Sequence, residues 1–107
     1  MTQAYPPIGQ VWQVRFGDMA FDLDFAADGK AMTYTHVGAG EAVALPQATV
    51  YYTAVPIRPG VFMVYWIEPD GSTVTHVEDF EQGVVHTNIT LPDGTFINKS
   101  GPLKRVR

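Results

Sequence analysis

The sequence predicts an all-β protein whose eight antiparallel strands run up and down and close into a barrel. Turn signals recur along the 107 residues, and the segments between them are rich in Val, Thr, Tyr, Phe and Ile. No segment has the apolar spacing of a helix. Nearly all connections are short hairpins, and a meander of this kind removes its exposed edges by closing into a barrel. A two-sheet sandwich with a filled core is the alternative.

Four turn signals punctuate the chain, and a longer loop follows the third strand. The signals are Gly17-Asp18, Asp28-Gly29, Pro69-Asp70-Gly71 and Pro92-Asp93-Gly94. Glycine tolerates positive φ, proline presets φ, and aspartate bonds its own backbone. The predicted strands cover residues 10–16, 19–26, 31–37, 47–56, 61–68, 73–80, 84–91 and 95–104. The Gly/Ala-rich stretch from Gly38 to Pro46 is the long loop.

Alternation of apolar and polar side chains predicts the inner face of the first three strands. The second strand has its apolar residues on one face: Met19, Phe21, Leu23 and Phe25. In the third strand we place Tyr34 and His36 inside. In the first strand Gln13 and Arg15 lie opposite the apolar set of Trp12, Val14 and Phe16.

The fifth strand, in the run VFMVYWIEPDG, is apolar on both faces. One face holds Phe62, Val64 and Trp66, with Glu68 on the same side, and the other holds Met63, Tyr65 and Ile67. One of the two can cover the interior while the other meets a partner, which suggests a homodimer through Met63, Tyr65 and Ile67. The pattern does not decide which face of the sixth strand is buried either. Val74, His76, Glu78 and Phe80 alternate there with Thr75, Val77 and Asp79.

Composition excludes several classes of protein. The chain has no cysteine, so disulfides, cysteine-bound zinc and a cysteine nucleophile are excluded. A net charge of −4 disfavours nucleic acid and anionic membranes as partners. Residues 1–10 lack the basic and apolar segments of a secretory signal, and no apolar run approaches the ~20 residues of a membrane span. We therefore expect a single cytoplasmic domain over residues 1–107.

The runs FGDMAFDLDFAADGKAMTYTHVGAG and GVFMVYWIEPDGSTVTHVEDF resemble the MoaF-like proteins, which are associated with molybdenum-cofactor gene clusters. They are also similar to the N-terminal barrel of bacterial phenolic acid decarboxylases. Both groups are lipocalin-like (calycin) β-barrels, so the resemblance implies that fold from about Gly9 to Thr95. Its most specific element is Trp66-x-Glu68-Pro69-x-Gly71.

The resemblance also implies roles for individual residues. It places Glu68 inside the barrel as a proton-transfer group, with Ser72 and Phe21 lining the same pocket. If it fixes the register, Val74 and His76 line the interior together with Arg15 from the first strand and Tyr34 and His36 from the third.

The chain departs from the decarboxylases at other positions. Gln13 and Arg15 stand near the positions of two substrate-binding tyrosines, and Gly40-Glu41 stands where a glycine precedes a catalytic arginine. Phenolic acid decarboxylase activity is therefore not expected, and the MoaF-like proteins are the closer match.

The candidate chemistry centres on Glu68. Burial in an apolar barrel would raise its pKa and make it a general acid or base, although pairing with Arg15 or exposure at the rim would make it structural. Arg15, if unpaired, is the candidate contact for an anion. His36, His76 and Glu68 could form a metal site, but hydrogen-bonded histidines are the favoured interpretation, and we expect no metal or cofactor.

Three functions are consistent with these residues. The first is a barrel that binds a small, flat organic molecule, which could be anionic. The second is a lyase, hydratase or isomerase with Glu68 as its catalytic residue. The third is a structural homodimer without a ligand. The candidate ligand-binding residues are Arg15, Phe21, Tyr34, His36, Trp66, Ser72 and His76.

Overall fold

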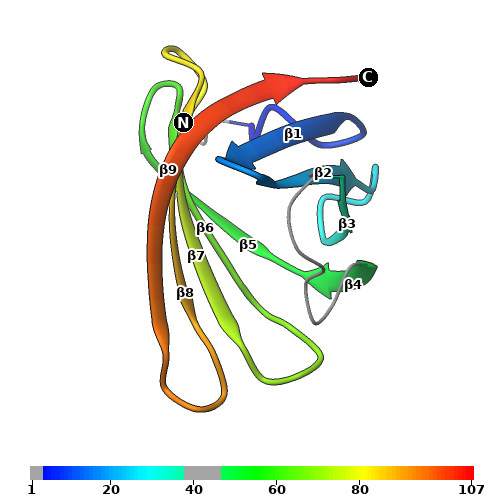
Figure 1. Cartoon of the computed structure of the whole chain (residues 1–107). Helices are drawn as coiled ribbons and strands as arrows, with labels where there is room; N and C mark the ends of the chain where they lie inside the picture. Colours follow the sequence, from blue (N-terminus) through cyan, green and yellow to red (C-terminus); the bar gives the residue numbers. More distant parts are fainter. Residues whose placement is uncertain (1–3, 38–46) are drawn as a thin grey trace.

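The computed structural model describes residues 4–37 and 47–107, and this part of the chain forms nine β-strands (Figure 1). The strands are β1 Val11–Phe16, β2 Met19–Phe25, β3 Ala31–His36, β4 Gln47–Tyr51, β5 Thr53–Arg58, β6 Val61–Ile67, β7 Thr73–Asp79, β8 Val84–Thr90 and β9 Phe96–Arg105. All pairings are antiparallel. No helix long and apolar enough to cross a membrane occurs among the described residues.

The strands form one strongly curved sheet that nearly closes into a barrel. Their order is β4-β3-β2-β1-β9-β8-β7-β6-β5, so β9 joins the first hairpins to the last ones. The two ends of the sheet, β4 and β5, are consecutive in the chain and are separated only by Tyr52. The predicted fourth strand is thus a single bent segment. Its first half pairs with β3 and its second half with β6, which accounts for nine strands in place of the eight predicted.

Aspartates and glycines form the hairpin turns as the sequence predicts. The Asp28 carboxylate accepts hydrogen bonds from the backbone N–H groups of Lys30 (2.8 Å) and Ala31 (3.1 Å). Asp93 accepts one from Thr95 N–H at 2.8 Å. Gly29 and Gly94 have φ of 72° and 89°, values that side chains with a Cβ rarely adopt. These turns fix the registers that carry the functional side chains.

A cluster of aromatic rings fills one end of the barrel. Tyr5, in the segment before β1, lies 5.5 Å from the ring of Phe25, 5.3 Å from that of Phe62 and 5.6 Å from that of Tyr52. The contacts with Phe25 and Phe62 are edge-to-face, a geometry that stabilises an aromatic core beyond the effect of area alone. The N-terminal segment therefore plugs this end, and open volume remains towards the other.

The structure assigns the faces that alternation left undecided. In β6, Phe62, Val64 and Trp66 are buried, whereas Tyr65 and Ile67 are exposed. In β7, Val74, His76 and Glu78 are the buried residues. The Gly38–Pro46 loop, including the Gly40-Glu41 pair, lies outside the described residues.

Candidate functional site

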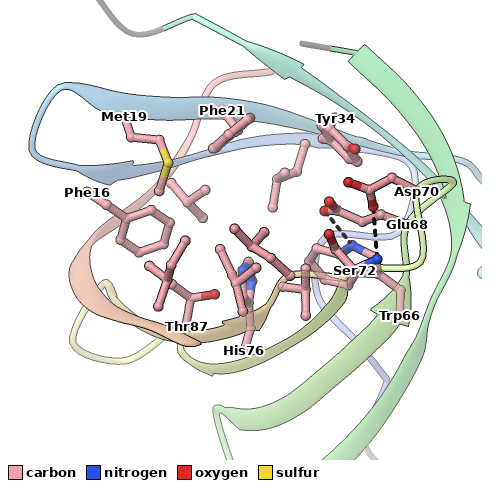
Figure 2. A pocket seen from close by; sticks show the side chains of 16 residues that line it. Phe16, Met19, Phe21, Tyr34, Trp66, Glu68, Asp70, Ser72, His76 and Thr87 are labelled. Atoms are coloured by element: carbon pink, nitrogen blue, oxygen red, sulfur yellow. Dashed lines mark hydrogen bonds between the residues drawn. The ribbon is translucent and has the colours of Figure 1, made fainter. Parts of the chain in front are cut away.

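The half of the barrel away from Tyr5 holds a cavity of about 250 Å³ (Figure 2). Its walls are mostly apolar and come from β1, β2, β8 and β9, for example Val14, Leu23 and Ile89. Seven lining residues carry polar groups: Tyr34, Trp66, Glu68, Asp70, Ser72, His76 and Thr87. Small-molecule sites usually combine apolar walls with a few polar groups of this kind, in volumes from ~300 Å³ upwards. The cavity is thus sized for a single-ring compound.

The turn between β6 and β7 brings Glu68 and Ser72 to the same rim of the cavity. Glu68 N–H donates to the Ser72 carbonyl (2.8 Å), and Gly71 N–H donates to the Glu68 carbonyl (2.9 Å). The Asp70 carboxylate accepts Ser72 N–H at 2.8 Å. These bonds satisfy the backbone N–H groups of Glu68, Gly71 and Ser72 within the turn, which explains the Glu-Pro-Asp-Gly sequence.

Glu68 is held at the cavity by Trp66. The indole Nε1–H donates to Glu68 Oε2 at 3.3 Å, one of the dashed contacts in Figure 2. Burial raises the pKa of Glu68, and the nearby Asp70 raises it further, while the Trp66 bond and His76 oppose the rise. Glu68 is therefore a carboxyl group with a raised pKa in an apolar site, which suits general acid or base chemistry.

His76 lies at the floor of the cavity, and Glu78 and Tyr5 beneath it orient its ring. Its Nδ1 is 2.9 Å from Glu78 Oε2, and Glu78 Oε1 accepts a hydrogen bond from the Tyr5 hydroxyl at 2.5 Å. Burial and Glu78 hold the pKa of Tyr5 well above its ordinary value, so its hydroxyl stays a donor. The Trp66 ring packs edge-on against the imidazole with 4.8 Å between centroids. These contacts fix the ring.

Two hydroxyl groups of cavity-lining residues have no hydrogen-bond partner among the described residues. They are Tyr34 Oη and Thr87 Oγ1, and both are buried. Burial, Glu68 and Asp70 raise the pKa of Tyr34 to about 12, so this hydroxyl remains protonated. Buried polar atoms without a partner are rare in proteins, and these two belong to residues of the cavity wall.

Six predicted site residues meet at this cavity: Phe21, Tyr34, Trp66, Glu68, Ser72 and His76. Their functional roles stay predictions. His36 packs on the Phe21 ring at 5.3 Å, but it is not among the lining residues. Its Nε2 is buried and has no hydrogen-bond partner in the described part of the chain.

The predicted position of Arg15 inside the barrel is wrong. It is exposed on the outer face of β1, while its neighbours Val14 and Phe16 are buried. Alternation had placed it opposite the apolar residues, and only the register taken from the resemblance turned it inward. It therefore lies away from Glu68 and is not among the described residues that line the cavity.

A metal site receives no support from the geometry. Within residues 4–37 and 47–107, no three His, Cys, Asp or Glu side chains are grouped so that they could hold a metal ion. His36 and His76 are thus not brought together with Glu68 as ligands.

Sequence reasoning missed Tyr5, Glu78 and Thr87. A signal existed for Glu78, because His76-x-Glu78 places both side chains on one face of a strand. Nothing in the local pattern around Tyr5 predicts that it reaches a residue 73 positions further along the chain.

Comparisons with known proteins agree with this fold. A family model described as MoaF-like matches residues 8–104. A crystal structure from Burkholderia vietnamiensis, named as "a putative beta-lactamase", superposes with a TM-score of 0.88 at 28% sequence identity. The match covers 98% of this chain and 100% of that one. No curated protein matches the chain.

Proposed function

The chain belongs to the MoaF-like family, and we propose that this member binds a small, flat, uncharged organic molecule inside its barrel. The observation that carries the proposal is the cavity itself. It combines apolar walls with a raised-pKa carboxyl group at Glu68 and a fixed imidazole at His76. A protein without a ligand would gain stability by filling such a space with side chains.

The charges at the cavity favour a neutral ligand. Glu68 and Asp70 line it, and no Lys or Arg is among its lining residues. With Arg15 on the outer surface, no guanidinium or ammonium group of the described lining residues would balance an anion. The aromatic rings of Phe21, Tyr34 and Trp66 offer faces and edges to a flat molecule.

A cavity-filling pair of variants tests this proposal. Val74→Phe on the inner face of β7 should fill the cavity and weaken binding of small aromatic probes by tenfold or more. Val77→Phe, on the exposed face of the same strand, should leave binding unchanged. Probe binding is measured by ligand-observed NMR after thermal unfolding has shown that both variants are folded. Equal binding by both variants would place the probes elsewhere on the protein.

An acid/base enzyme is the second candidate, and a specific observation favours it. Glu68 and His76 line one cavity and interact electrostatically, so a molecule between them would contact two proton-transfer groups. Glu68→Gln should then retain ligand affinity within about threefold and lose turnover by 10²-fold or more. Unchanged turnover in this variant would remove Glu68 from the reaction.

Hydrolysis of a β-lactam, which the name of the Burkholderia structure suggests, has little support in this cavity. Serine lactamases pair their nucleophile with a lysine. Ser72 lines the cavity here, but its described neighbour is Asp70, and no lysine is among the lining residues.

A further inference from the structure

The Tyr5–Glu78–His76 network lies beneath the cavity and makes no use of Glu68. We propose that it keeps a proton on His76 Nε2, so that the cavity takes a molecule whose uncharged carbonyl oxygen accepts this N–H. The inference rests on the proposed function and names its ligand class. The centre of the network is buried, since Glu78 is 1% and His76 3% exposed.

Among the described residues, His76 is the one basic side chain that contacts Glu78. In the described part of the chain, the remaining ion pairs join Arg58 to Asp79 and to Glu81. No Lys or Arg lies within 4.0 Å of Glu78. An uncompensated buried carboxylate costs several kcal/mol, roughly, so burial favours the states in which the Glu78–His76 pair is neutral overall.

Both neutral states of the pair place a proton on Nε2. In one, the Glu78 carboxylate faces an imidazolium, whose two ring nitrogens are both N–H groups. In the other, a protonated Glu78 donates to Nδ1, and the neutral imidazole carries its hydrogen on Nε2. Only the state with a net negative charge leaves Nε2 bare, and the Tyr5 hydroxyl is a single neutral donor to that charge.

Nε2 is the ring atom that the cavity can reach. Nδ1 is taken by Glu78, and the Trp66 and Phe16 rings flank the imidazole, with centroids 4.8 and 6.3 Å away. Nε2 has no described hydrogen-bond partner, yet it is not among the sealed buried atoms. An N–H donor is thus presented at the floor of an apolar cavity, where a hydrogen bond gains strength from the low local dielectric.

The surrounding groups select a carbonyl over other acceptors. Glu68 and Asp70 oppose a carboxylate or phosphate by repulsion. A ring compound with an uncharged C=O satisfies the His76 donor without placing a further negative charge beside Glu68 and Asp70.

Nitrogen-15 NMR of selectively labelled histidine in the free protein at neutral pH tests the protonation state directly. The expected result is that His76 Nε2 has the shift and one-bond proton coupling of an N–H nitrogen. A non-protonated Nε2 would overturn the inference and leave the proposed function untouched. This readout needs neither a ligand nor a variant.

A matched pair of probes tests the ligand class. Acetophenone and α-methylstyrene have nearly the same shape and differ by C=O against C=CH₂. We expect acetophenone to bind about tenfold tighter, the worth of one good hydrogen bond to a charged or polarised donor. His76→Gln, which retains an N–H near the position of Nε2, should preserve the preference, and His76→Met should abolish it. Equal binding of both probes to the wild-type protein would overturn the inferred preference for a carbonyl group. It would leave the proposal that the cavity binds a small molecule unchanged.

Discussion

Glu68 and Glu78 are two carboxyl groups in one barrel, and their surroundings give them different roles. Glu68 sits at the cavity rim, contacts Trp66 through one hydrogen bond and has a raised pKa. Glu78 is fully buried, and each of its oxygens has a partner. A satisfied, buried group positions its neighbours, whereas a partly satisfied group at a cavity can exchange protons with a ligand.

The Tyr5 and Tyr52 hydroxyls give a matched test of the buried network. Tyr5→Phe leaves a Glu78 oxygen without its donor and should lower the free energy of unfolding by about 1–3 kcal/mol. Tyr52→Phe removes a hydroxyl that has no partner among residues 4–37 and 47–107, and should change the free energy of unfolding by less than about 0.5 kcal/mol, or raise it. Urea unfolding measures both. Equal losses would show that the Tyr5–Glu78 bond contributes nothing specific.

Glu68 should also give stability a characteristic pH dependence. Its folded-state pKa is raised, so the folded protein binds a proton that the unfolded chain, with a glutamate pKa of ~4.3, has already released. The free energy of unfolding therefore falls as pH rises from the unfolded pKa through the folded one. Glu68→Gln should match the wild type below that window and be the more stable protein above it.

Asp70 supplies the control of opposite sign. Its pKa is lowered by hydrogen bonds from Ser72, so its contribution is present above the unfolded pKa and is lost on acidification. Asp70→Asn should consequently be less stable than the wild type at neutral pH. A Glu68→Gln variant that is also less stable there would contradict the buried setting of Glu68. Thermal unfolding across pH provides the measurement.

At the scale of elements, most of the fold could be predicted, including the barrel, but the division of the fourth predicted strand into β4 and β5 could not. The strand predicted over residues 61–68 is observed as Val61–Ile67, because turn signals act locally. The bend at Tyr52 depends on two strands distant in sequence. Both faces of β6 are apolar, so alternation alone could not orient Trp66 and Glu68. In β1 the alternation was right, and the register from the resemblance misplaced Arg15.

Gly101 in β9 marks a close approach that the sequence does not reveal. A Cβ at this position would lie 1.8 Å from the Arg15 carbonyl oxygen in β1. Gly101→Ala should therefore separate the two strands and cost more than ~3 kcal/mol, at the upper end of overpacking effects. Ser100→Ala, at the exposed neighbouring position, should be nearly neutral. Similar unfolding midpoints for both variants would contradict the close contact.

The molecule as a whole is a barrel with one plugged end, one hollow half and an apolar outer face over β4, β6 and β7. On this face Tyr51 is 79%, Ile67 69% and Tyr65 41% exposed. Exposed apolar patches mark interaction sites, so the homodimer predicted through Met63, Tyr65 and Ile67 stays a proposal for this surface.

Sedimentation velocity tests the dimer. The wild type should sediment as a dimer at micromolar concentration, and Ile67→Lys should weaken association at least tenfold. Phe96→Lys replaces an equally exposed apolar residue on β9 and should not affect the assembly. A wild-type protein that stays monomeric at all concentrations would refute the dimer proposal and would not affect the proposed binding in the cavity.

The most direct test of the central claim is a crystal structure of the protein as purified, with the cavity between Glu68 and His76 inspected for bound molecules. The predicted result is density for a flat organic molecule against the apolar wall, with a polar atom at hydrogen-bond distance from His76 Nε2. A cavity closed by its own side chains, or holding only ordered water, would contradict the account.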